Sequence, residues 1–320
     1  MLRKIRSVTV LGRSPKQDSM YVFKSCFQFG CLTICIYFQR STPHSVDSTN
    51  HTTSSLSVHH LHGIALARYK LLLKFRSPPL KDFGPSAFQL NRKQLIKRGS
   101  RVRLTEALTM DFIARNTTIP VPRVINVFEI RGSIHIVQEY IDAPVLADVW
   151  SQMSLDEQKS CLGQLQEYLE QLRALTPPEP GRVQAIDGTG CLDDRLHPGE
   201  WGPFDSIDTF NAFFYHDIVR QRPADYPGAQ DPLAKVQGRK WRTVFSHGDL
   251  GPHNILWKDG RIVAIIDWEC AGWFPEYWEY TRSYFGPRLL GWWEMYQEFT
   301  VQYPDELEVE MKLAAYFVRI

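Results

Sequence analysis

Several features that would assign this sequence to a specialised class are missing from it. Its 37 Lys and Arg residues nearly balance 35 Asp and Glu, and the basic residues are scattered, so no nucleic-acid partner is expected. The six cysteines include no C-x-x-C pair and no regular spacing. That pattern indicates ordinary reduced thiols and favours a cytoplasmic protein over a disulfide-linked secreted one.

A long apolar run is also missing. The stretch 26–38 is apolar but contains Gln28, and it is shorter than the roughly 20 residues that a membrane span needs. No small-residue cleavage site follows it, so no membrane association is expected. Residues 1–75 include a Ser-, Thr- and His-rich tract, and we expect an irregular, flexible N-terminal segment there.

The rest of the chain divides into a part rich in strand signals and a part rich in helix signals. The first part has a short strand at 94–98, a helix at 102–116, and two strands around the turn Arg131-Gly132. The second part has a helix that begins with the capping box of Ser154 and Glu157, and a second amphipathic helix over 205–219. This order predicts an α+β protein of 320 residues, long enough for a sizeable core.

The most informative stretch is 245–280, which carries His247, Asp249, Asn254 and Asp267. Apolar runs on both sides of Asp259-Gly260 predict a two-residue hairpin. Because the hairpin folds the second run back on the first, Asn254 and Asp267 are expected to lie near each other, with Asp249 in the loop just upstream. A carboxylate, an amide and a second carboxylate would then converge on one point.

Kinase-type phosphoryl transfer uses such a set. An Asp accepts the proton of the attacking hydroxyl, while an Asn in the same loop and an Asp on the next hairpin hold Mg²⁺. Asp249 and Asn254 have the spacing of H-R-D-x-x-x-x-N. Two other interpretations compete: Asp267 as a simple helix cap, and a metallophosphoesterase site formed with His247 and His253. No second metal-binding cluster supports the latter.

The segments HGDLGPHN and IIDWE resemble the signature of the aminoglycoside phosphotransferase and choline kinase superfamily, and AGWFPEYWEY resembles its fungal members of unassigned substrate. The resemblance covers roughly 94–280. It implies a protein-kinase-like two-lobed fold, with a small antiparallel-sheet N-lobe at 76–143 and a larger, mainly helical C-lobe at 144–320 that carries the catalytic loop and the metal-binding hairpin. It also implies that Asp249 is the catalytic base, His247 supports its loop, and Asn254 and Asp267 bind Mg²⁺.

Two further sites follow for the nucleotide, ATP. A strand Lys paired with a Glu on the next helix holds the α- and β-phosphates in kinases, and Lys97 and Glu106 fit these roles. By resemblance, backbone groups of Glu139, Tyr140 and Ile141 form the hinge that bonds adenine. No G-x-G-x-x-G precedes Lys97, so a small-molecule kinase and a non-catalytic binding module of the same fold both stay open.

The acceptor, a small molecule with a hydroxyl group, is not identified by the sequence. An acidic set would suit a cationic acceptor, although a solvated surface is the more common explanation for such a set: Asp193, Asp194, Glu200, Asp205 and Asp208. An aromatic set would cage a quaternary ammonium, although such spacing is more often helix packing: Trp268, Trp273, Phe274, Tyr277, Trp278 and Tyr280.

Overall fold

The computed structural model of the chain describes residues 21–29, 32–40, 56, 58–60, 86–193, 197–286 and 289–317. It comprises two compact units, Met1–Thr53 with His62–Leu72, and Ser54–Leu61 with Leu73–Ile320. In the first unit, β1 (Tyr21–Phe29) and β2 (Leu32–Arg40) pair as an antiparallel hairpin. The sequence predicted only an irregular segment in this region, so these two strands were missed.

A five-stranded sheet opens the second unit, in the order β3-β6-β7-β5-β4. Its strands are β3 (Val58–His60), β4 (Ala87–Asn91), β5 (Gln94–Arg98), β6 (Val124–Ile130) and β7 (Ser133–Glu139). The predicted strand 94–98 and the predicted hairpin at Arg131-Gly132 are confirmed. Arg131 and Gly132 both have positive φ, a conformation that glycine adopts without strain, so Gly132 suits this turn. The edge strand β3 comes from the segment that was expected to be irregular.

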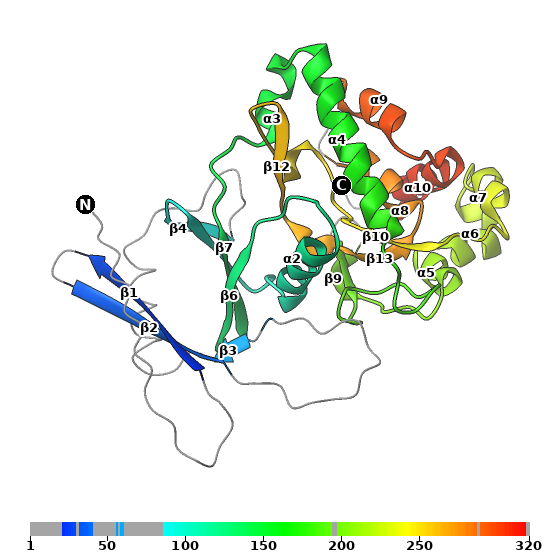
Figure 1. Cartoon of the computed structure of the whole chain (residues 1–320). Coiled ribbons are helices and arrows are strands. Elements are labelled where there is room, and N and C mark those ends of the chain that lie inside the picture. The colour runs from blue at the N-terminus through cyan, green and yellow to red at the C-terminus, as the bar shows by residue number, and fades with distance from the viewer. Residues whose placement is uncertain are drawn as a thin grey trace. The chain divides into compact units, whose positions relative to one another are not determined.

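Helix α2 (Leu104–Asn116) follows β5 and lies against this sheet (Figure 1). Its buried face includes Ala107, Met110 and Ile113, three of the residues that join the sheet to the main hydrophobic core. The helix predicted at 102–116 is confirmed, with its start two residues later. Its placement brings the first turn of α2, and therefore Glu106, next to the middle of β5.

The rest of the unit is mainly helical (Figure 1). Its helices are α3 (Leu146–Val149), α4 (Leu155–Ala174), α5 (Ile207–Phe213), α6 (His216–Gln221), α7 (Gln230–Val236), α8 (Trp278–Tyr284), α9 (Trp292–Tyr296) and α10 (Pro304–Phe317), with 3₁₀ turns η2 (Trp150–Gln152), η3 (Pro223–Asp225), η4 (Pro252–Asn254), η5 (Trp268–Cys270) and η6 (Gln297–Phe299). Its strands form three two-stranded pairs: β8 (Cys191–Asp193) with β9 (His197–Trp201), β10 (Thr243–Ser246) with β13 (Gly272–Pro275), and β11 (Ile255–Lys258) with β12 (Arg261–Ile265).

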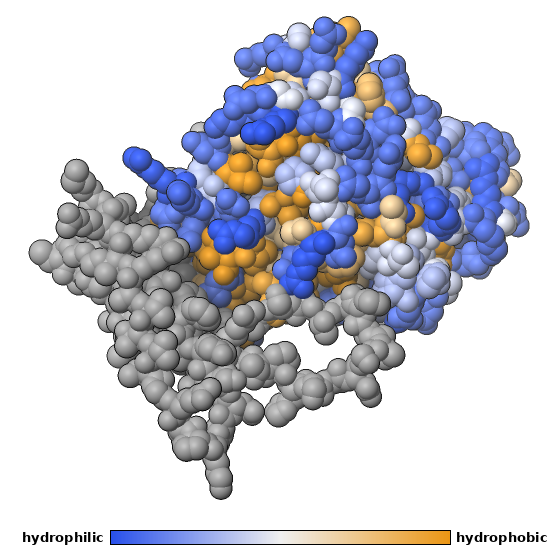
Figure 2. All heavy atoms as spheres, viewed as in Figure 1, coloured by the Kyte–Doolittle hydropathy of each residue, from blue (hydrophilic) through white to orange (hydrophobic). Residues whose placement is uncertain are grey.

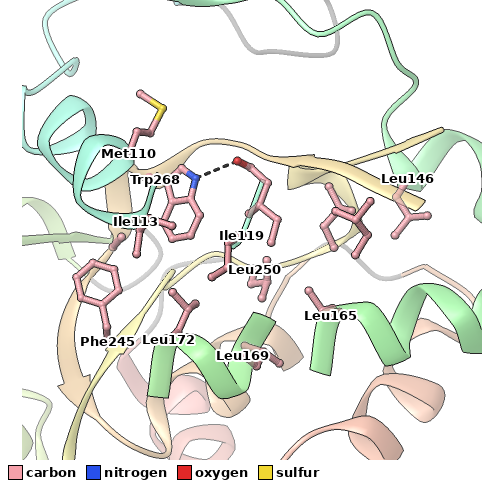
Figure 3. Packing of buried hydrophobic residues seen from close by; sticks show 14 of the residues in the cluster. Met110, Ile113, Ile119, Leu146, Leu165, Leu169, Leu172, Phe245, Leu250 and Trp268 are labelled. Carbon is pink, nitrogen blue, oxygen red and sulfur yellow. Dashed lines mark hydrogen bonds between the residues drawn. The ribbon is translucent and has the colours of Figure 1, made fainter. Parts of the chain in front are cut away.

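Helix α4 is the long helix of this lobe. Its predicted capping box is present, since the Ser154 side chain accepts from the Glu157 N–H and the Glu157 carboxylate accepts from the Ser154 N–H. Its buried leucines line one face and pack into the cluster shown in Figure 3, together with Phe245, Leu250 and Trp268. Because Phe245 and Leu250 flank the loop that carries Asp249, this core fixes both ends of that loop.

The amphipathic helix predicted over 205–219 is wrong in one respect, because the structure divides it into α5 and α6. Tyr215 adopts φ 69°, a left-handed conformation that no α-helix contains. The preceding Phe214 packs edge-on against the Trp201 ring, with centroids 5.3 Å apart. Packing of these rings therefore overrides the local helical pattern.

The hairpin β11–β12 is held at its turn by the long helix α4. Its turn, Asp259-Gly260, confirms the predicted hairpin. The Gln164 side chain of α4 donates to the Gly260 carbonyl (3.2 Å) and accepts from the Ile262 N–H (3.0 Å). The long helix thus fixes the turn and, through it, the end of β12 where Asp267 follows.

Hydrophilic residues cover most of the helical lobe on the face shown in Figure 2. The large hydrophobic residues that remain exposed are scattered: Leu155, Phe213, Leu290, Val301, Met311 and Tyr316. Among the described residues, no helix combines the length and the apolar character that a membrane span requires.

Candidate active site

Lys97 joins the two lobes. It lies on β5 between β4 and β7, and its Nζ donates to Glu106 Oε1 of α2 (2.5 Å) and to Asp267 Oδ1 (2.8 Å). Burial by itself would lower the pKa of Lys97, but the carboxylates of Glu106 and Asp267 outweigh it and raise that pKa well above its usual range. Lys97, Glu106 and Asp267, three of the predicted residues, are thus in contact, with the Lys97 ammonium group charged between the two carboxylates.

Asp267 stands in an unusual backbone conformation. Its φ of 65° is positive, which is uncommon for a residue other than glycine and is concentrated at functional sites. It precedes the 3₁₀ turn η5, yet its side chain makes no capping hydrogen bond. The interpretation of Asp267 as a helix cap is therefore wrong, and the carboxylate is presented to Lys97 instead.

Across the hairpin, Asn254 pairs with Ile266, the residue before Asp267. The Ile266 N–H donates to the Asn254 carbonyl oxygen (2.9 Å), as the predicted fold-back requires. The Asn254 side-chain amide donates to the backbone carbonyl of Asp249 (2.9 Å) and to its Oδ2 (3.1 Å). Asn254 therefore connects the loop that carries Asp249 to the strand end that carries Asp267.

The Asp249 side chain is partly exposed. Its side chain is 27% exposed, and Oδ2 lies 3.2 Å from His253 Nε2. His253 and Asn254 thus fix the carboxylate by two contacts. The described residues place this carboxylate in the loop before β11, which is where the sequence predicted it.

His247 is completely buried and supports this loop. Its Nε2 lies 3.0 Å from the Ile266 carbonyl oxygen, and its Nδ1 lies 3.3 Å from the Asp249 backbone N–H. A ring that donates through Nε2 and accepts through Nδ1 is neutral. Burial lowers the pKa of His247 to about 4, which agrees with a neutral ring. Its position suits support of the loop rather than proton transfer.

Glu279 of α8 was not predicted, and it anchors the same loop through backbone N–H groups. Its Oε2 accepts from the His247 N–H (2.5 Å) and the Gly248 N–H (3.2 Å). Gly248 has φ 79°, and a Cβ there would lie 2.6 Å from the Cys270 carbonyl oxygen. The loop therefore accepts only glycine at position 248. Glu279 follows 31 residues later, and no local pattern in the sequence marks it as a partner of this loop.

Glu269 is a second residue that the sequence analysis missed. Carboxylate oxygens of Glu106, Asp267 and Glu269 all lie within 4.8 Å of one another, as a metal site requires. Burial raises the pKa of Glu269 to about 7, and the negative charges of Asp267 and Glu106 add to the rise. The sequence signal that could have identified Glu269 is its position two residues after Asp267. Carboxylate oxygen is the donor that Mg²⁺ prefers, so this group fits that ion.

The predicted hinge lies where the sheet ends. The Glu139 N–H donates to the Arg123 carbonyl, and the Tyr140 N–H donates to the Lys93 carbonyl, both at 3.0 Å. The Ile141 N–H makes no backbone hydrogen bond within the described part of the chain. Of the N–H groups in the predicted hinge 139–141, those of Glu139 and Tyr140 are therefore already bonded to backbone carbonyls, and that of Ile141 is not.

Neither set of residues that the sequence suggested for an acceptor forms one continuous open surface among the described residues. All six aromatic residues after Asp267 are buried by packing, with exposures of 4% or less, so they form no open cage. Asp193 is also buried, at 2% exposure, and Asp194 lies outside the described residues. The acidic set is therefore not one solvated surface.

Comparisons with known proteins identify the family of the chain. A model of a family described as "Phosphotransferase enzyme family" matches residues 96–306, a span that contains all the predicted site residues. The trifolitoxin immunity protein of Rhizobium leguminosarum bv. trifolii is 28% identical over 121 residues, which are 32% of this chain and 43% of that protein. This match therefore spans less than half of that relative.

Solved structures agree on the fold. The crystal structure of aminoglycoside phosphotransferase APH(4)-Ia superimposes with a TM-score of 0.53 at 17% identity, covering 78% of this chain and 88% of that one. At this identity the likeness shows the fold alone. The chain thus has the predicted kinase-like, two-lobed α+β fold.

Proposed function

The chain belongs to the phosphotransferase enzyme family, and we propose that it is an ATP- and magnesium-dependent kinase acting on a hydroxyl group of a small molecule. The observation that carries the proposal is the contact of one buried lysine, Lys97, with Glu106 and Asp267, at 2.5 and 2.8 Å. This contact joins the element that would hold the nucleotide phosphates to the element that would hold the metal. We further propose that the protein is cytoplasmic and that the boundary between the two lobes lies between residues 143 and 144.

In the proposed reaction, Asp249 accepts the proton of the acceptor hydroxyl. The hydroxyl oxygen then forms a bond to the γ-phosphorus, and the bond from that phosphorus to the β,γ-bridging oxygen breaks. The bridging oxygen keeps the electron pair, so ADP and a phosphate monoester are the products, and the Asp249 proton is lost to solvent. The contacts from His253 and Asn254 keep the carboxylate oriented for this step.

Lys97, Asp267 and Asn254 have separate roles in binding. Lys97 donates to the α- and β-phosphates, and Glu106 keeps its flexible side chain directed at them. Asp267 and Asn254 would hold Mg²⁺, which neutralises phosphate charge when bound, and Glu269 adds a second carboxylate beside that of Asp267. Ile141 would supply the hinge N–H for adenine, next to the backbone of Glu139 and Tyr140.

The replacement Asp267→Asn tests the metal site. With ATP and Mg²⁺ at 100 times the dissociation constant, mass action stabilises the parent chain by about 2.7 kcal/mol. We expect most of this stabilisation to vanish in Asp267→Asn, because the variant loses the ionised ligand but keeps the side-chain shape. Thermal unfolding with ATP, in the presence of Mg²⁺ or of a chelator, measures the effect.

The matched control is Asp259→Asn, which makes the same chemical change on the same hairpin. Asp259 is an exposed turn residue with φ 51°, a conformation that Asn adopts readily. This variant should keep the full response to Mg²⁺ and ATP. Equal responses of Asp267→Asn and the parent chain would place the metal site elsewhere.

Lys97 and Glu106 should act as one unit. Lys97→Met and Glu106→Gln are each expected to weaken nucleotide binding, and the double variant should be little weaker than Lys97→Met, since coupled neighbours are not additive. A double-mutant cycle on the ATP dissociation constant measures the coupling. Fully additive losses would show that the two side chains do not cooperate. No loss in either variant would favour the non-catalytic interpretation of the sheet lobe.

A further inference from the structure

The start of helix α2 has no local cap, although Glu106 lies in its first turn. Arg103 occupies the N-cap position in an extended conformation, with φ −113° and ψ 153°, and its side chain makes no capping hydrogen bond. In many helices a capping side chain accepts from the free N–H groups of the first turn and fixes it locally. The position of the first turn of α2 therefore depends on contacts outside the helix.

The Arg103 side chain reaches the helical lobe instead, where β9 lies beside α2 (Figure 1). Nη1 and Nη2 both donate to the Gly190 carbonyl oxygen at 3.1 Å, and Nη2 also donates to Thr189 Oγ1 at 3.0 Å. Nη2 further lies 3.2 Å from Glu200 Oε2 of β9. One guanidinium group thus joins the start of α2 to a turn that follows 86 residues later in the chain.

The turn that receives Arg103 is firmly attached to the helical lobe. The Gly190 N–H donates to Glu200 Oε1 (3.0 Å), and a Cβ at Gly190 would lie only 2.7 Å from Glu200 Cγ. Upstream of the turn, Gln184 exchanges two backbone hydrogen bonds with Trp273 of β13, at 3.2 and 2.8 Å. Because β13 follows η5, and η5 follows Asp267, this turn is bonded to the segment that carries Asp267.

We propose that Arg103 is a positioning residue for nucleotide binding, a role that rests on the proposed function. Glu106 follows Arg103 by three residues, which is less than one turn of helix. Lys97 Nζ contacts both Glu106 and Asp267, so the start of α2 and the end of the hairpin have to keep one spacing. Arg103 fixes that spacing by bonding α2 to the helical lobe, and its planar guanidinium group gives the contact a defined direction.

The exposure of this contact separates positioning from simple stabilisation. The Arg103 side chain is 20% exposed, and that of Glu200 is 49% exposed. Ion pairs with such exposure contribute little to the free energy of unfolding. Replacing Arg103 should therefore leave the fold intact while it releases the first turn of α2 from the helical lobe.

Hydrogen exchange followed by mass spectrometry tests the proposal on the full chain without any nucleotide. Arg103→Gln keeps an amide donor but loses the charge and the planar fork. Exchange of the backbone amides in 104–110 should become about 2- to 10-fold faster, the effect of one hydrogen bond. Exchange in α4 and the midpoint of urea unfolding should stay at the parental values.

Arg115→Gln is the matched control, because Arg115 lies in the last turn of the same helix and pairs with Asp111, four residues earlier. It makes the same chemical change without involving the helical lobe through that pair. Exchange in 104–110 should therefore be the same in Arg115→Gln as in the parent chain.

Binding of ATP with Mg²⁺ gives a second readout. Arg103→Gln should raise the dissociation constant by about 2- to 30-fold, the range for residues that affect a ligand without touching it. Arg103→Lys should recover part of the loss, since an ammonium group keeps the charge and can donate to the Gly190 carbonyl. Glu200→Gln, in the other lobe, should also weaken ATP binding, with little further effect when it is added to Arg103→Gln.

Four results would each overturn the proposal: unchanged exchange in 104–110, equal effects of Arg103→Gln and Arg115→Gln, a large fall in the urea midpoint of Arg103→Gln, or parental ATP affinity in Arg103→Gln. A parent chain that does not bind ATP would contradict the proposed function instead. The exchange comparison contains no nucleotide, so it would still decide whether Arg103 holds the start of α2.

Discussion

Replacing Asp249 with Ala is expected to lower the rate of phosphoryl transfer by about 10²–10⁴-fold, the range that a general base contributes. The carboxylate is the only part of Asp249 that the proposed reaction uses. Its backbone carbonyl would still accept from the Asn254 amide, and its N–H would still face His247 Nδ1. The loop should therefore keep its shape while losing the proton acceptor.

Two measurements distinguish this result from simple misfolding. Urea unfolding of Asp249→Ala should give a midpoint close to that of the parent chain, because the side chain is partly exposed. Its affinity for ATP with Mg²⁺ should also be nearly unchanged. Turnover at the parental rate would contradict the assignment of Asp249 as the base.

Arg282→Ala should lower the free energy of unfolding by roughly 3–5 kcal/mol, the typical cost of removing one partner of a buried ion pair. Arg282 of α8 is 2% exposed and pairs with Glu310 of α10. Its guanidinium also lies over the rings of Trp278 and Phe285, at 4.5 and 4.9 Å. The substitution removes these contacts and leaves the Glu310 carboxylate buried without its partner.

The accompanying change in Glu310 gives a second way to examine this pair. Burial raises the pKa of Glu310, and Arg282 opposes the rise, so Arg282→Ala should raise that pKa further. Adding Glu310→Gln should recover part of the lost stability, because it removes the carboxylate that Arg282→Ala leaves without its partner. Arg220→Ala is the control, since its pair with Asp217 is exposed, and it should change stability by less than about 0.5 kcal/mol. Equal losses in Arg282→Ala and Arg220→Ala would contradict this account.

Features set by neighbouring residues could be predicted from the sequence. The turns Arg131-Gly132 and Asp259-Gly260 and the Ser154 capping box depend on a few adjacent residues, and all three are present. The hairpin also implied that Asn254 lies beside the end of β12, and the hydrogen bond from the Ile266 N–H to the Asn254 carbonyl joins Asn254 to the residue before Asp267.

Features set by packing between distant segments could not be predicted. The contact of Lys97 with Asp267 spans 170 residues, and Glu279 acts on a loop 31 residues before it. The break at Tyr215 contains neither glycine nor proline, because surrounding rings rather than local preference produce it. The aromatic residues after Asp267 are a further example. Their spacing in the sequence is compatible with an open cage, but packing in the folded chain buries them.

The most direct test of the central claim follows the γ-phosphoryl group itself by ³¹P NMR. The parent chain is incubated with ATP, Mg²⁺ and a panel of small hydroxyl compounds, beside Asp249→Ala and a sample with chelator. The account predicts that ADP and a phosphate monoester form in equal amounts with at least one acceptor, only with Mg²⁺, and at least about 100-fold more slowly in Asp249→Ala. Monoester formation that is unaffected by Asp249→Ala, or Mg²⁺-dependent ATP binding without transfer to any hydroxyl compound, would contradict it.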